Sequence, residues 1–145
     1  MKSWAFLALL TLAFWAAEAR AAETIWSGLV IADNVARPEA VPAELKPLEH
    51  KLRQLFGYNQ LQIIGQTTKT LVSGQEDCVA WSRYFTLQVD ARGQKGAGYT
   101  LDLKLWKQRE LLLETQAKLS RRSPLVIKGP QVGSGQLLLV LLVQQ

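Results

Sequence analysis

The sequence has very few of the residues that most often ligate metals or act as nucleophiles. Its 145 residues include one cysteine, Cys78, and one histidine, His50. A single cysteine excludes an intramolecular disulfide framework and the cysteine-rich zinc modules. A single histidine excludes the common multi-histidine metal sites and leaves one candidate base for a catalytic triad. We therefore expect no metal and no cofactor.

Long hydrophobic runs are also few, and one of them opens the chain. Lys2 precedes the largely apolar segment Trp4–Trp15, which is shorter than the roughly 20 residues that a membrane-spanning helix needs. Small residues follow in the pattern of a signal-peptidase site, either Ala17-Glu18-Ala19 or Ala19-Arg20-Ala21. Residues 1–21 are therefore predicted to be a cleaved export signal, with a retained anchor as the alternative. We expect residues 22–145 to form one domain in the periplasm or outside the cell.

The charge of the chain is moderate. The net charge is +5, and removal of residues 1–21 takes away two basic residues and one acidic residue, which leaves +4. This value is ordinary for a soluble domain. In an exported protein it argues against a nucleic-acid partner and leaves an anionic envelope polymer or lipid head groups as alternatives.

The rest of the sequence indicates strands around one helix. Alternation is clearest over Cys78–Val89, with Val79, Trp81, Phe85, Leu87 and Val89 on the inner face, and over Tyr99–Trp106. The other predicted strands are Ile25–Ala32, Asn59–Gly65, Thr67–Ser73, Glu110–Leu119, Leu125–Lys128 and Gly135–Val143. Turns are predicted over 91–98 and at Gly129-Pro130. The pattern predicts a mainly β domain, an antiparallel sandwich or partly closed barrel of about seven or eight strands.

The predicted helix covers Ala43–Phe56 and packs on the sheet. Its apolar residues fall within an arc of about 100°, which is typical of a core-facing stripe. They are Leu45, Leu48, Leu52, Leu55 and Phe56. Gly57 stands where a helix C′ glycine belongs, while Pro42 and Pro47 both suit the beginning of the helix.

Cross-strand chemistry predicts one register. Pairing Leu105 with Leu113 keeps the apolar faces together, puts Lys104 opposite Glu114 and puts Trp106 opposite Leu112. The final strand carries seven successive apolar residues, Leu137–Val143. We expect it to be central and covered on both faces, with self-association through this strand as the alternative.

The candidate catalytic groups are few. His50 is expected to face solvent, and Cys78 follows Glu76 and Asp77, whose charges do not favour a thiolate. Whether Cys78 stays free or pairs between chains is left open. Asp90, Asp102, Glu110 and Glu114 are the strand carboxylates, and the Asp102–Glu114 neighbourhood is the one opening for a small hydrolase. A solvated sheet surface is the simpler interpretation.

Surface recognition has more support. Aromatic and basic residues gather in the sequence around the fifth predicted strand, a combination that binds polysaccharide, peptide or acidic polymer. The candidate recognition residues are Tyr84, Lys104, Trp106, Lys107 and Arg109, with Trp26 as a further aromatic. Cross-strand packing of Trp106 is the alternative. Arg121 and Arg122, near Lys118 and Lys128, form a second basic cluster that we interpret as a solvated loop.

Two motifs resemble those of a family of uncharacterised small exported bacterial proteins. One is Leu-Phe-Gly-Tyr at 55–58 followed by Leu-Gln-Ile-Ile-Gly at 61–65, and the other is Gly-Pro-x-x-Gly-x-Gly-x-Leu-Leu at 129–138. The resemblance implies a bacterial envelope setting and carries over no site residue. Together with the missing catalytic groups, it predicts an exported, non-enzymatic binding or assembly module of the cell envelope, whose partner is an envelope protein or an anionic envelope polymer. The alternatives are the carboxylate hydrolase and a structural protein that associates through its last strand.

Overall fold

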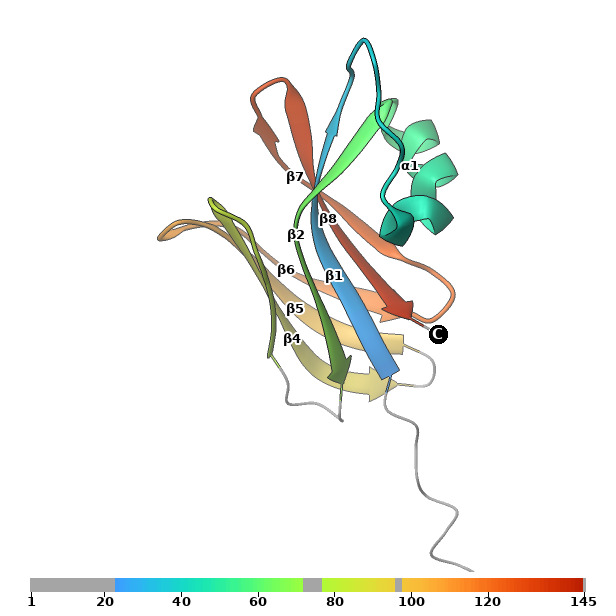
Figure 1. Ribbon diagram of the computed structural model, residues 1–145. Helices are drawn as coiled ribbons and strands as arrows, with labels where there is room; N and C mark the ends of the chain where they lie inside the picture. The colour runs from blue at the N-terminus through green and yellow to red at the C-terminus, as the bar shows by residue number, and fades with distance from the viewer. Residues whose placement is uncertain (1–22, 72–76, 96–97, 145) are drawn as a thin grey trace, which may run out of the picture.

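The computed structural model describes residues 23–71, 77–95 and 98–144, and residues 1–21, with their predicted export signal, lie outside this part of the chain. The described chain forms a sandwich of two four-stranded antiparallel sheets, with strand orders β2-β1-β8-β7 and β3-β4-β5-β6 (Figure 1). The elements are β1 (Glu23–Asp33), η1 (Ala43–Leu48), α1 (Glu49–Phe56), β2 (Gln60–Leu71), β3 (Asp77–Trp81), β4 (Phe85–Lys95), β5 (Gly98–Lys107), β6 (Glu110–Ser120), β7 (Leu125–Val132) and β8 (Gly135–Gln144). The predicted mainly β sandwich with one helical segment is confirmed.

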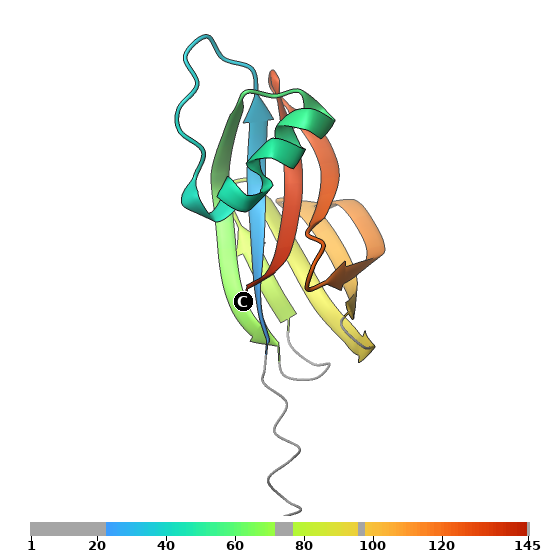
Figure 2. The ribbon, with the colours of Figure 1, turned by 90° about the vertical axis from the view of Figure 1, so that its right-hand side faces the viewer.

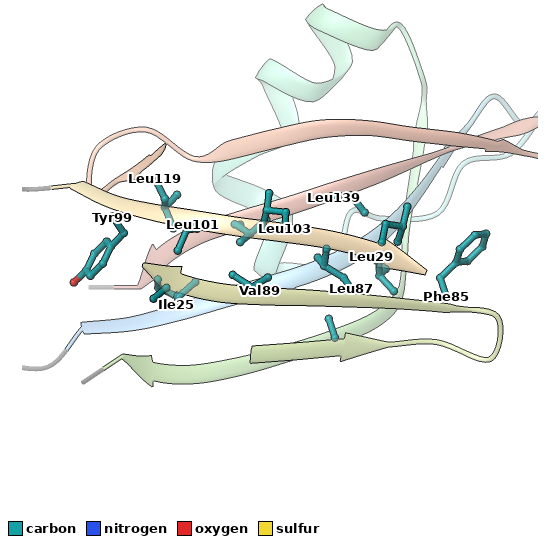
Figure 3. Close-up of a cluster of buried hydrophobic side chains, with 14 of the residues drawn as sticks. Ile25, Leu29, Phe85, Leu87, Val89, Tyr99, Leu101, Leu103, Leu119 and Leu139 are labelled. Atoms are coloured by element: carbon teal, nitrogen blue, oxygen red, sulfur yellow. The ribbon is translucent and has the colours of Figure 1, made fainter. Parts of the chain in front are cut away.

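The main core lies between the two sheets. Alternate residues of β1 and β8, such as Ile25, Leu29 and Leu139, meet alternate residues of β4 and β5, such as Leu87 and Leu103 (Figure 3). Each of these side chains is almost completely buried. Burial of apolar surface, at about 25 cal/mol per Å², lets this layer stabilise the folded state.

A second core lies between the outer face of the β2-β1-β8-β7 sheet and the helical segment. Figure 2 shows η1 and α1 crossing β1 and β8. Leu45, Leu48 and Leu52 contribute to this core, together with Val30 and Val140 from the sheet. Strand β8 is therefore buried on both faces, and it pairs with β1 on one side and β7 on the other. This confirms the predicted central strand and leaves β8 no free edge for a second chain.

The helical segment differs from the single predicted helix over Ala43–Phe56. Its first part, η1, is a 3₁₀ helix that contains Pro47, and α-helical geometry begins only at Glu49. Proline has no N–H to donate and clashes with the preceding turn, so an α-helix does not run through it. The predicted C′ glycine is confirmed, because Gly57 has a left-handed φ of 70° and its N–H donates to the Arg53 carbonyl. Leu55, predicted to face the core, is 70% exposed.

Three predicted strand boundaries are wrong. The predicted break between Gly65 and Thr67 is absent, and β2 runs through it with a bulge opposite Leu29 and Val30. The predicted turn at Gly129-Pro130 is an irregular part of edge strand β7, where a proline costs no ladder hydrogen bond. Strands β4 and β5 also continue into the predicted turn over 91–98.

Trp26 is fully buried in the second core, so its predicted solvated position is wrong. Its indole Nε1 donates to Gln66 Oε1 at 2.8 Å, which satisfies the one polar atom of the ring. The ring lies over Gly28, where any Cβ would overlap it. Alternation placed Trp26 on one face of β1, but it did not show that a helix covers that face.

Gly65 allows the two sheets to meet along one edge. A Cβ on this β2 residue would overlap the carbonyl oxygen of Trp81 in β3. We predict that Gly65→Ala forces the strands apart and lowers the free energy of unfolding by about 1–3 kcal/mol, the usual cost of overpacking. Urea denaturation measures the loss. Gly129→Ala is the matched control, because a Cβ there would lie 3.3 Å from its nearest neighbour, the Leu137 carbonyl oxygen. Equal losses in both variants would contradict the close approach.

Tyr99 closes one end of the main core. Burial raises the pKa of its phenol above the ordinary value of 10.0, so the folded state favours the neutral form. The contribution of the neutral phenol to the free energy of unfolding is fully present below pH 10. It is lost as the pH rises through the raised pKa of the folded state. We therefore expect the wild type to lose more stability than Tyr99→Phe between pH 8 and pH 11, measured by urea unfolding at each pH. Parallel losses would show that the phenol is not responsible.

Candidate functional site

A tight turn at 82–84 separates β3 from β4 within the segment predicted as one strand. The Ser82 N–H donates to the Phe85 carbonyl at 2.7 Å, and the Ser82 Oγ accepts from the Phe85 N–H at 3.0 Å and the Tyr84 N–H at 3.3 Å. The hydroxyl thus supplies the hydrogen bonds that close the turn. Arg83, which interrupts the apolar alternation, is the sequence signal for this break. Its guanidinium lies 5.6 Å from the centre of the Tyr84 ring.

Because of this turn, the residues of β3 that point inward are those that the alternating pattern predicted to point outward. Phe85, Leu87 and Val89 face the core as predicted, but Ala80 rather than Trp81 is buried in β3. Trp81 is 72% exposed on the outer face of the β3-β4-β5-β6 sheet. The predicted inward position of Trp81 is therefore wrong, because the phase of an alternating pattern does not carry across a turn.

Trp81 begins a row of side chains across all four strands of this sheet. It pairs with Thr86, Thr86 pairs with Trp106, and Trp106 pairs with Leu111. Directly paired residues lie on the same face of a sheet. Trp106 is half-buried and Leu111 is 40% exposed. We call this row, Trp81–Thr86–Trp106–Leu111, the aromatic row.

The predicted register between β5 and β6 is confirmed as far as Leu105 and shifts by one residue at Trp106. Leu105 pairs with Leu113 and Lys104 with Glu114, as predicted, but Trp106 pairs with Leu111 instead of Leu112. A bulge between Leu105 and Trp106 absorbs the extra residue of β6. The bulge places Leu111 on the outer face beside Trp106.

Polar side chains occupy the next positions along the outer face. Gln88, Lys104 and Glu114 form the adjoining row, and the Lys104 Nζ lies 3.9 Å from the Glu114 Oε1. Beyond them, Asp90 pairs with Asp102. The outer face therefore changes along the strands from aromatic to polar and charged.

The β5–β6 turn is joined to the β3–β4 turn. Gln108 adopts a left-handed φ of 54°, and its N–H donates to the Tyr84 carbonyl at 3.1 Å. A non-glycine residue in this conformation is uncommon and depends on its surroundings to hold it there. The hydrogen bond fixes Tyr84 relative to Lys107 and Arg109.

A cleft of about 410 Å³ lies at this end of the sandwich, where the two sheets diverge (Figure 1). We call it the end cleft. Its walls come from both sheets and are mostly apolar, with a few polar groups. The lining residues are Tyr84, Phe85, Lys107, Glu110, Leu112, Pro130, Gln131, Val132 and Gly133.

Four of the five predicted recognition residues fall into two neighbouring groups, and Arg109 lies outside both. Lys104 and Trp106 lie on the outer face, whereas Tyr84 and Lys107 line the end cleft. Arg109 is exposed in the β5–β6 turn and does not line the cleft. Sequence analysis missed two exposed members of the aromatic row, Trp81 and Leu111. The polar pair Ser82-Arg83 was the sequence signal for the turn that exposes Trp81. The bulge that exposes Leu111 has no signal in the sequence.

The structure gives two of the four predicted carboxylates, Asp102 and Glu114, basic neighbours. The Asp102 Oδ2 accepts from the Arg92 Nε, while its Oδ1 is buried without a hydrogen-bond partner in the described part of the chain. Glu114 lies near Lys104. Among the residues with described placement, no group of three or more histidine, cysteine, aspartate or glutamate side chains is arranged to hold a metal ion.

The two members of a possible Cys–His pair lie in different layers of the fold. His50 is exposed on α1, as predicted, and α1 covers the β2-β1-β8-β7 sheet. Cys78 belongs to β3 in the other sheet, and its side chain lies outside the described part of the structure. The arrangement of the elements gives no support to a Cys–His pair.

Comparison of the chain with protein-family models, with curated proteins and with solved structures found no match. Within the described residues, no helix is both long enough and apolar enough to cross a bilayer.

The contrast between two tryptophans tests the assignment of the outer face. Trp26 is 1% exposed and Trp81 is 72% exposed. We predict that Trp26→Ala lowers the free energy of unfolding by about 3–5 kcal/mol, because it empties a packed core. Trp81→Ala should change it by less than about 0.5 kcal/mol. Chemical denaturation of both variants is the measurement, and a large loss for Trp81→Ala would place that ring in the core.

Proposed function

We propose that this protein is an exported, non-enzymatic binding module that recognises an extended polysaccharide through the aromatic row. The observation that carries the proposal is the placement of two indoles, Trp81 and Trp106, on one face of a rigid sheet. Export is supported by the pattern of residues 1–21. Exposed aromatic side chains grouped on one face are typical of binding surfaces.

The spacing of the two rings suits a linear glycan. Strand β4 separates β3 from β5, so the backbones that carry Trp81 and Trp106 are about 10 Å apart. The paired residue between them is Thr86, whose side chain is short. This distance is comparable to the repeat of a disaccharide in an extended chain. Sugar rings present C–H groups to aromatic faces, and neighbouring indoles therefore contact alternate sugars.

The polar row beside the indoles supplies hydrogen-bonding groups for sugar hydroxyls. Gln88 provides an amide, while Lys104 and Glu114 provide a cation and a carboxylate. The Lys104–Glu114 pair is long and its Glu114 side chain is 61% exposed. Exposed ion pairs of this kind contribute little stability, so exchanging the pair for ligand hydroxyls costs little.

A substitution experiment on the aromatic row tests the proposal. Trp81→Ala and Trp106→Ala should each weaken retention on a neutral polysaccharide about tenfold, or about 1.4 kcal/mol, because each removes one ring contact. Native gels containing hydroxyethylcellulose, laminarin or xylan measure the retention.

Leu55→Ala is the matched control for this experiment. Leu55 is 70% exposed on α1, outside the aromatic row, so its removal should leave retention unchanged. Wild-type migration that no polysaccharide slows, or equal retention of folded tryptophan variants, would overturn the proposal. Retention on a protein ligand alone, lost in the same variants, would assign the row to a protein partner instead.

A further inference from the structure

A second groove lies at the opposite ends of β6 and β7 from the end cleft. Its volume is about 760 Å³, and its walls come from the η1–α1 junction, the β6–β7 turn and the end of β8. Figure 1 shows these three segments on one side of the molecule. We call it the basic groove. It is lined by Pro47, Leu48, His50, Lys51, Ser120, Arg121, Arg122, Pro124, Leu142, Val143 and Gln144.

Among the residues that the structure describes, the charged side chains that line the basic groove are cationic. Lys51 stands on the helical wall, and Arg121 and Arg122 stand on the wall formed by the turn. No described aspartate or glutamate lines it. The nearest acidic residue in the helix is Glu49, whose Oε1 lies 3.1 Å from the Arg53 Nη2. A concave surface with charges of one sign concentrates its field and attracts ligands of the opposite sign.

An adjoining hollow of about 280 Å³ extends the basic groove. Leu48, Lys51 and Pro124 line both, and the hollow continues toward Leu55 and Val126. Apolar side chains such as Pro47 and Leu142 line the basic groove beside its cations. A chain of linked rings with anionic groups offers both kinds of contact.

We propose that the basic groove binds an acidic polysaccharide, whose carboxylates or sulfates contact Lys51, Arg121 and Arg122. Arginine presents a planar fork of donors that matches an oxyanion, and Arg122 stands in the turn with such a fork. The basic groove has a wall on each side, which suits a single polymer strand better than the flat surface of a bilayer. This site is independent of the aromatic row, which lies on the outer face of the other sheet.

Binding to polygalacturonate, which carries carboxylates, and to heparin, which carries sulfates, tests the basic groove. The double variant R121A/R122A should bind whichever polymer the wild type binds at least about tenfold more weakly, as expected for the loss of charge-assisted hydrogen bonds. Lys51→Gln changes the opposite wall and should weaken binding in the same direction. Fluorescence anisotropy with labelled polymer measures both, and circular dichroism checks the fold.

A charge-matched control separates the basic groove from general basicity. The double variant R37A/K128A also removes two exposed cations, neither of which lines the groove, and should bind within about twofold of the wild type. W81A/W106A should retain acidic-polymer binding, so this site and the aromatic row fail separately. An equal loss in the control, no binding of either polymer by the wild type, or stronger binding to phosphatidylglycerol vesicles or an oligonucleotide would overturn the proposal.

Discussion

The pairing of β1 with β8 in the middle of one sheet determines the arrangement of the other layers. Both strands carry apolar residues on both faces, so the sheet needs a cover on each side. The β3-β4-β5-β6 sheet covers one face, and the helical segment covers the other. The second sheet needs only one cover, and its outer face is therefore left to polar residues and the aromatic row. The outer face that carries the candidate binding surface is thus open because the helical segment 43–56 covers the other sheet.

Much of the fold was predictable because its signals are local. The alternation over Tyr99–Trp106, the charge pair Lys104–Glu114 and the apolar run Leu137–Val143 each specify a strand, its register or its burial. Gly57 ends the helix through its own backbone conformation. In each case the residues whose pattern made the prediction are also the residues that form the strand, the pair or the helix end. The prediction therefore did not depend on the position of other elements.

The errors arose where distant contacts, or a turn without the usual turn residues, decide the outcome. The strand pattern around Trp26 is that of a residue on a solvent-exposed face, and Trp26 is buried only because the helical segment covers that face. Trp81 depends on a turn closed by a serine hydroxyl, without the glycine, proline or asparagine that usually marks one. Tyr84 and Lys107 were predicted as recognition residues, but the cleft they share requires Pro130–Gly133 from the other sheet. Local patterns therefore identified several residues of the site but not their grouping.

The central position of β8 has a consequence for how the chain acquires its structure. Both hydrophobic cores include β8 side chains, so neither is complete until Gly135–Gln144 has left the ribosome. The earlier strands form an incomplete sandwich during synthesis, and their apolar faces remain available to chaperones. Because β8 pairs with β1 across more than a hundred intervening residues, closing the sandwich is a long-range and intrinsically slow step. A chain with this topology therefore completes both of its cores only after its last strand has been made.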